Sequence, residues 1–132
     1  MKKLTIVLSI ATAFALQSVA FAGPHFNAFV SVSKGSTSSS AYGSLSSARY
    51  YSSDSQQYIG CSSAADLVSS IYISCTARDA QGNYLYCYSN NADGQARQAV
   101  ASVNNTSSVY FQVNNSTGKC TYISVSNLSS NL

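Results

Sequence analysis

The sequence predicts a mainly β domain: an antiparallel β-sandwich or half-open barrel with one short helix, stapled by disulfides. Three observations lead to this fold class. Apolar and polar residues alternate with period two over residues 71–78 and again over 84–88, on either side of a turn. Only residues 92–103 show helical periodicity. An even set of cysteines follows an export signal: Cys61, Cys75, Cys87 and Cys120.

The first 22 residues predict a cleavable signal peptide. Met1, Lys2 and Lys3 precede an apolar run that ends on the small-x-small motif at residues 20–22, so the mature chain is expected to begin at Gly23. The compact form of this signal is typical of bacteria. We therefore expect an exported protein, periplasmic or extracellular, in which the cysteines are oxidised. No second apolar run approaches the ~20 residues of a membrane helix, so no membrane association is expected after signal removal.

Composition divides the mature chain into two parts. Residues 23–40 contain a weak alternation and then a serine-rich tract with little to bury, which predicts a loose N-terminal leader. Residues 41–132 are expected to form a single β-rich domain. Its first element is predicted as a short strand over 44–51, and its helix is expected to begin at a capping Asn91.

The centre of the domain predicts a hairpin. Residues 71–78 place isoleucine, cysteine and alanine on one face, residues 79–83 supply turn chemistry, and residues 84–88 return with leucine and cysteine on the same face. A strand over 57–61 is expected before this hairpin. After the helix, alternation at 109–113 and 120–126 predicts a second hairpin.

Sequence symmetry places three cysteines in one row. Cys75 and Cys87 are equidistant from Gln81, and Cys61 and Cys75 are equidistant from Val68, so any two of the three can be close. Spacing alone does not settle the pairing. We favour Cys61–Cys75 with Cys87–Cys120, the second of which ties the helical connection to the sheet. Strict alternation puts Cys120 on the face of Tyr122 rather than that of Ile123, and a bulge at residues 118–119 is expected to correct this.

Metal, cofactor and catalytic sites are not predicted. Structural zinc sites usually have cysteine pairs two to four residues apart, and these gaps are far wider. His25 stands third in the mature chain, but Pro24 has no amide proton to lose, so a terminal Cu(II) or Ni(II) site is not expected. The chain has no glutamate and one histidine, and its four aspartates are dispersed. A nucleophile–base pair or a carboxylate pair is therefore not apparent, and we do not expect an enzyme.

Tyrosines form the candidate binding surface. One face of the central hairpin carries aromatic rings and a cation opposite the Ile/Cys face, and the later strand extends this set if it joins the same sheet. The predicted binding residues are Tyr72, Arg78, Tyr84, Tyr86, Tyr88, Tyr110 and Gln112. Tyrosine offers a flat apolar ring with a polar tip, which suits sugars or a partner protein. The alternative is that strands simply favour tyrosine and that a second layer covers this face.

Several segments resemble an uncharacterised group of small exported bacterial proteins with four cysteines and a β-rich fold. The resemblance rests on Tyr58-Ile59-Gly60-Cys61, on the run from Cys75 to Asn83, on Cys87 and on Gly118-Lys119-Cys120-Thr121. It covers about residues 41–128 and implies the four-cysteine order and a helix before the last hairpin. It implies no catalytic residue.

Charge narrows the partners that we expect. Without the signal, five basic residues oppose four aspartates, and they are scattered rather than arranged in the basic stripe that nucleic acids require. The leading hypothesis is a non-enzymatic exported binding module for a surface polysaccharide or a partner protein. Abundant serine, asparagine and tyrosine also fit a structural component of an extracellular matrix or fibre. An inhibitor of a secreted hydrolase is a third, weaker hypothesis.

Overall fold

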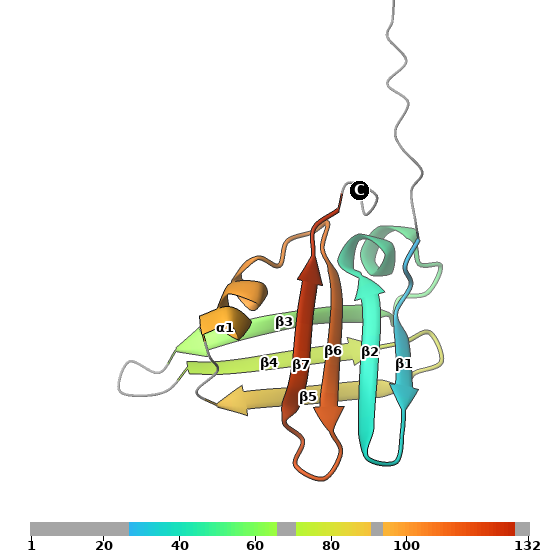
Figure 1. Cartoon of the computed structure of the whole chain (residues 1–132). Coiled ribbons are helices and arrows are strands. Elements are labelled where there is room, and N and C mark those ends of the chain that lie inside the picture. Colours follow the sequence, from blue (N-terminus) through green and yellow to red (C-terminus); the bar gives the residue numbers. More distant parts are fainter. Residues whose placement is uncertain (1–26, 66–70, 91–93, 129–132) are drawn as a thin grey trace, which may run out of the picture.

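The fold is a two-layer β-sandwich, which confirms the predicted class. A computed structural model describes residues 27–65, 71–90 and 94–128. The predicted signal peptide and the predicted helix cap at Asn91 lie outside these residues. The described strands form a four-stranded sheet, order β1-β2-β6-β7, and a three-stranded sheet, order β3-β4-β5, both antiparallel. The strands of one sheet run across those of the other (Figure 1).

The four-stranded sheet combines the two ends of the described chain. Its strands are β1 (Ser31–Lys34), β2 (Ser38–Ser44), β6 (Ser108–Asn114) and β7 (Cys120–Ser126). The prediction of a loose leader over residues 23–40 is wrong for 31–40, because β1 and the start of β2 pair in register within this sheet.

Serine content misled that prediction. Ser39, Ser44 and Ser47 are buried despite their polarity. The hydroxyl of Ser39 donates to Asn115 Oδ1 at 2.9 Å, and the hydroxyls of Ser44 and Ser46 lie 2.8 Å apart. Small side chains whose hydroxyls are hydrogen-bonded can occupy an interior position, so a serine-rich tract is not necessarily solvated.

The three-stranded sheet has the register that the cysteine spacing predicts. It consists of β3 (Tyr58–Ala65), β4 (Ile71–Arg78) and β5 (Tyr84–Asn90). Cys61 lies opposite Cys75, and Cys75 lies opposite Cys87, so the row of three cysteines is confirmed. All three lie on the inner face, where Cys75 and Cys87 are fully buried.

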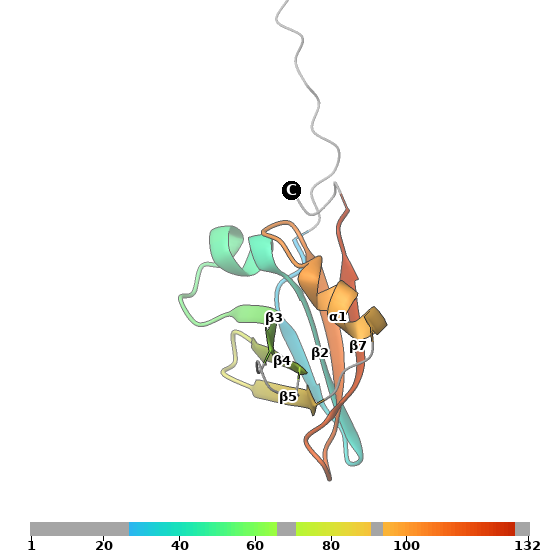
Figure 2. The same cartoon turned by 90° about the vertical axis from the view of Figure 1, so that its left-hand side faces the viewer.

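The core lies between the two sheets. Fully buried Val109 and Phe111 come from β6, and fully buried Ile73 and Ala77 come from β4. The helix α1 (Gly94–Ala101) contacts β3 and β7, the edge strands of the two sheets, and buries Val100. Figure 2 shows this helix on the same side of the three-stranded sheet as the second layer. Residues 47–51, predicted within a strand, instead form a short helical segment, η1 (Ser47–Tyr51).

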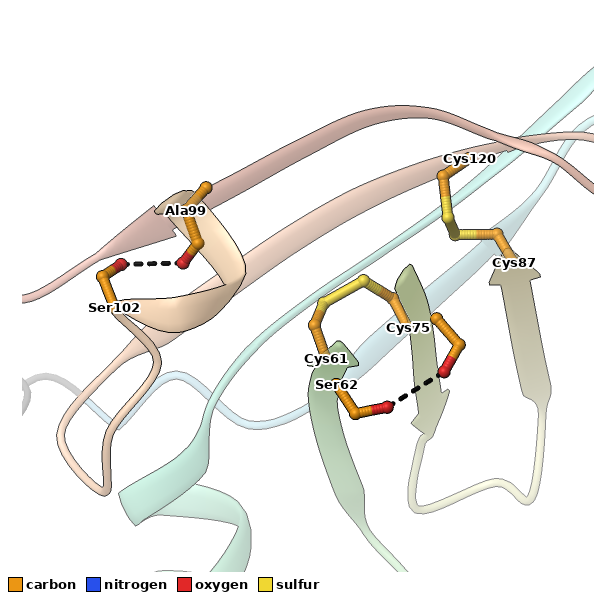
Figure 3. Close-up of a disulfide and its surroundings, with 8 residues drawn as sticks. Cys61, Ser62, Cys75, Cys87, Ala99, Ser102 and Cys120 are labelled. Carbon is orange, nitrogen blue, oxygen red and sulfur yellow. Dashed lines mark hydrogen bonds between the residues drawn. A yellow bond between two sulfur atoms is a disulfide. The ribbon is translucent and has the colours of Figure 1, made fainter. Parts of the chain in front are cut away.

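One corner joins the sheets covalently. The disulfides are Cys61–Cys75, within the three-stranded sheet, and Cys87–Cys120, between the sheets, as we favoured (Figure 3). Beside the second bond, the Tyr88 amide donates to the Gly118 carbonyl at 3.2 Å. Cys120 pairs with Val113 and Tyr122 with Gln112, so the extra residue of the expected bulge is Thr121 and not residues 118–119. Only an extra residue between Cys120 and Ile123 can turn both to one face.

Within the described parts of the chain, no helix has the length and apolar character needed to cross a membrane.

Candidate functional site

The outer face of the three-stranded sheet holds the candidate site. Strand register arranges its residues in four rows across β3, β4 and β5. From one end of the sheet these rows are Tyr58–Arg78–Tyr84, Gly60–Thr76–Tyr86, Ser62–Ser74–Tyr88 and Ala64–Tyr72–Asn90. We call this surface the tyrosine face. It brings together five of the predicted residues: Tyr72, Arg78, Tyr84, Tyr86 and Tyr88.

The tyrosine face is open among the described residues. Tyr72, Tyr84 and Tyr86 are 43%, 48% and 44% exposed, and Tyr88 is half-buried. The four-stranded sheet and α1 pack on the opposite, inner face (Figure 2). The alternative in which a second layer covers these rings does not hold for the described part of the chain.

Small residues lie between the rings. Gly60 has open space where a side chain would start, with no heavy atom within 4 Å of an added Cβ. The hydroxyls of Ser62 and Ser74 lie 3.0 Å apart across β3 and β4. With Thr76 they make a low, hydroxyl-rich surface beside the rings of β5. Tyr86 and Tyr88 are near-parallel, with ring centroids 6.4 Å apart.

Arg78 is the single charged residue in the four rows. It stands between Tyr58 and Tyr84, its Nε is buried without a hydrogen-bond partner, and its Nη2 lies 3.7 Å from the Cβ position of Gly82. Burial, together with the neighbouring phenols of Tyr58 and Tyr86, raises the pKa of Tyr84. A phenol with a raised pKa stays neutral at physiological pH, so the face carries one positive charge and no negative one.

A hydrogen-bonded turn follows Arg78 directly after β4. Asp79 is buried, and its carboxylate accepts hydrogen bonds from the Asn83 amide at 2.8 Å and from Asn83 Nδ2 at 2.9 Å. Burial acts to raise the pKa of Asp79, but these hydrogen bonds outweigh it and hold the pKa below its usual value. Gly82 adopts a φ of +83°, which glycine accepts without strain. This carboxylate organises a turn.

Tyr110 and Gln112 do not belong to this site, which corrects the extended prediction. They lie on β6, in the other sheet, so the condition that the later strand joins the hairpin sheet is not met. Tyr110 packs edge-to-face on Tyr122 with ring centroids 5.8 Å apart. The sequence shows that β6 alternates, but it does not show which sheet β6 joins.

Tyr58 is the aromatic residue of the tyrosine face that the sequence did not predict. It is 44% exposed and lies opposite Arg78. The sequence does contain a signal for Tyr58. Side chains alternate between the two faces of a strand, and those of Ile59 and Cys61 face the core, so that of Tyr58 must face outward.

A pocket adjoins the Tyr58 end of the tyrosine face. Its volume is about 290 Å³, and it lies between η1 and β3. We call it the η1 pocket; its lining residues are Leu45, Ala48, Arg49, Tyr50, Gln57, Tyr58, Ile59 and Asn105. A second hollow, of about 580 Å³, lies between α1 and β7 and has no charged lining residue.

Cysteine chemistry is committed to disulfides in this structure. The sulfurs of Cys75, Cys87 and Cys120 lie within 4.8 Å of one another, as in a metal cluster. All four cysteines are paired, however, so none is a thiolate that can ligate zinc. His25 lies outside the described residues.

Comparisons with known proteins leave the site to be judged on its geometry. No protein-family model matches the chain, and searches among curated proteins and solved structures return no significant match.

Proposed function

We propose that this chain is an exported, non-enzymatic binding module that holds a surface polysaccharide on its tyrosine face. The observation that carries the proposal is a set of exposed rings beside small hydroxyl side chains on a face without any carboxylate. Sugar rings have apolar C–H faces and hydroxyl edges. Tyrosine rings match the former, while serine, threonine and asparagine side chains match the latter.

A polysaccharide fits this face better than a protein partner. Protein interfaces are centred on packed hot spots that exclude water. Here the residues between the rings are Gly60, Ser62, Ser74 and Thr76, and the four rows contain no leucine, isoleucine, valine or phenylalanine. Such a surface is polar and shallow, as suits a hydrated ligand that lies along the sheet.

Binding to insoluble and soluble glycans tests the proposal. The oxidised mature protein is applied to peptidoglycan and to neutral polysaccharide resins, and retained ligands are then titrated by calorimetry. Tyr86→Ala is expected to weaken binding roughly tenfold, as for an aromatic hot spot. The matched control is Tyr42→Ala, because Tyr42 is 45% exposed and Tyr86 44%, but Tyr42 lies on the other sheet.

Two outcomes would count against the proposal. Equal loss in both variants would assign the effect to general stability. Retention of a protein from an extracellular fraction, with no glycan retained, would favour a protein partner instead.

Strand addition is a second candidate function, favoured by the sheet edges. The edge strands β3 and β7 contain no charged residue and no proline, the features that usually block edge-to-edge pairing. Assembly into a matrix or fibre would use these edges. Sedimentation velocity over increasing protein concentration measures it: Ser124→Lys in β7 should abolish any oligomer, and a strict monomer at high concentration rejects this candidate.

A further inference from the structure

The η1 pocket differs in chemistry from the face that it adjoins. Leu45, Ala48 and Ile59 contribute apolar lining, and Ala48 and Ile59 are buried. Asn105 and two tyrosine rings add polar atoms. Apolar lining with a few polar groups is the usual composition of a small-ligand site, and about 290 Å³ is at the lower limit of such sites. This volume suits one ring rather than a chain.

The charge in the pocket lining is positive. Arg49 is the single charged lining residue, and its guanidinium lies 5.7 Å from the ring centroid of Tyr50. That contact holds the cation beside the pocket. The carboxylate of Asp54 lies beyond Gln57 and is already engaged, since it accepts from Gln57 Nε2 at 2.6 Å and from the Gln56 and Gln57 amides. Arg49 therefore has no carboxylate partner among the lining residues.

Tyr58 links the pocket to the tyrosine face. Its ring lines the pocket, and in the sheet it lies opposite Arg78. Tyr58 thus shares the pocket lining with Arg49 and a row of the tyrosine face with Arg78.

We propose that the η1 pocket is a subsite for one acidic sugar of the bound polysaccharide, with the carboxylate on Arg49 and the ring against Tyr58. This inference rests on the proposed function, since the remaining sugars lie on the tyrosine face. The guanidinium donates to a carboxylate in a fixed fork geometry, which makes arginine suited to this recognition.

Calorimetric titration with matched oligosaccharides tests the subsite. The probes are an oligomer of galacturonic acid, the same oligomer with its carboxylates reduced to alcohols, and galacturonic acid alone. The acidic oligomer is expected to bind roughly tenfold more tightly than the reduced one, and Arg49→Gln should remove this difference. The control Lys34→Gln makes the same charge change on β1 and should preserve it.

The results separate the two proposals. Equal binding of both oligomers by the unmodified protein would overturn the subsite and leave the tyrosine face standing. If the acidic oligomer binds no more tightly than galacturonic acid itself, and Tyr86→Ala leaves its binding unchanged, the tyrosine face is overturned and the pocket stands. Absence of binding by all three probes would overturn the acidic-sugar subsite, while the resin experiment would still judge the tyrosine face.

The adjacent cysteine sulfurs carry a second, independent inference. Cys75 lies opposite both Cys61 and Cys87, and its sulfur is within 4.8 Å of those of Cys87 and Cys120. Cys75 and Cys87 are fully buried, whereas Cys61 and Cys120 are partly exposed. An external reagent therefore has access to one partner of each bond, and the buried sulfurs of Cys75 and Cys87 have access to each other.

We infer that an attack at Cys61 is relayed to the bond between the sheets. An external thiolate attacks the Cys61 sulfur, forms a mixed disulfide and expels Cys75 as a thiolate. The Cys75 thiolate attacks the Cys87 sulfur, forms Cys75–Cys87 and expels Cys120, which takes a proton from water. One external thiol is consumed, and the covalent link between the sheets is opened.

Trapping of free thiols tests the relay. The unmodified protein is treated with limiting glutathione, quenched with iodoacetamide and mapped by mass spectrometry; alkylation is expected on Cys120 and glutathione on Cys61. In Cys61→Ala the free thiol should likewise move from Cys75 to Cys120. The control Cys75→Ala leaves a free Cys61 and should keep Cys87–Cys120 intact. Alkylation confined to Cys75 in both experiments would overturn the relay, and if Cys61→Ala does not fold, the unmodified protein decides.

Discussion

The two sheets use the same residue types for different purposes. In the four-stranded sheet, large apolar side chains such as Phe111 fill the interior, and two outer tyrosines, Tyr110 and Tyr122, pack on one another. In the three-stranded sheet, cysteines occupy the central inner row, and the outer tyrosines of β5 lie beside small residues of β3 and β4. Packing between the layers thus stabilises both sheets, and the three-stranded sheet has in addition a covalent bond within itself and one to the other sheet. This leaves the outer rings of the second sheet available for a ligand.

Phe111→Ala should produce the largest change in stability. Phe111 is fully buried on β6, and loss of a buried phenylalanine typically costs about 3–5 kcal/mol. Urea denaturation of the oxidised protein would measure the free energy of unfolding. A loss under about 1 kcal/mol would show that the four-stranded sheet does not depend on apolar packing.

Removal of Cys87–Cys120 should cost slightly less, and removal of Cys61–Cys75 less again. The chain-entropy model gives about 4 kcal/mol for the loop of separation 33 and about 3 kcal/mol for that of 14. Paired alanine variants, each lacking one bond, would be compared by urea denaturation. The reverse order would mean that the bond within the three-stranded sheet matters more than the bond between the sheets.

The outer tyrosines should separate stability from binding. Tyr110 is half-buried and packs on Tyr122, so Tyr110→Ala should lower the free energy of unfolding by about 1–2 kcal/mol and leave glycan binding unchanged. Tyr86→Ala should lower it by at most about 1 kcal/mol and reduce binding. If the two variants behave alike in both assays, the contrast between the sheets fails.

Acid should produce the smallest effect, through two turns. Hydrogen bonding from Gln57 lowers the pKa of Asp54 from 3.8 to about 2, and the pKa of Asp79 is also lowered. A carboxyl whose pKa is lower in the folded state stabilises the fold fully above its unfolded pKa, and this stabilisation disappears as the pH falls through the folded value. Urea midpoints should therefore decrease from pH 4 to pH 2, and less so in Asp79→Asn. An equal decrease in that variant would show that Asp79 does not contribute to the loss of stability in acid.

Local pattern was sufficient for the hairpin and the cysteine row. Alternation around Gln81 determined which residues face the core, and equal spacing about Gln81 and Val68 placed the cysteines opposite one another. The alternation of apolar and polar residues was insufficient to predict which of the two sheets a strand joins. The strand that carries Tyr110 alternates in the same way whichever sheet it joins, and only its pairing with β2, distant in sequence, assigns it and its hairpin partner β7 to the four-stranded sheet.

Composition did not predict the first strands, because some of their buried residues are serines rather than apolar residues. Ser39 belongs to a strand because backbone pairing with β6 and a hydrogen bond from its hydroxyl satisfy its polar groups, although its segment resembles a linker. Tyr58 could have been assigned to the site, because in a regular strand residues 58 and 61 lie on opposite faces and Cys61 faces the core. The η1 pocket could not, since its residues come from three separate parts of the sequence.

Because of the bulge at Thr121, the effect of a deletion in β7 on the covalent link between the sheets depends on which residue is deleted. Thr121 is the unpaired residue that lets Cys120 and Ile123 face the core together, opposite Val113 and Phe111. Deletion of Thr121 would therefore restore a regular ladder and still direct Cys120 toward Cys87. Deletion of a residue between Ile123 and Ser126 would reverse the faces of every residue on one side of the cut. The strand β7 is thus expected to tolerate the loss of one residue at Thr121, because Thr121 has no partner in the ladder.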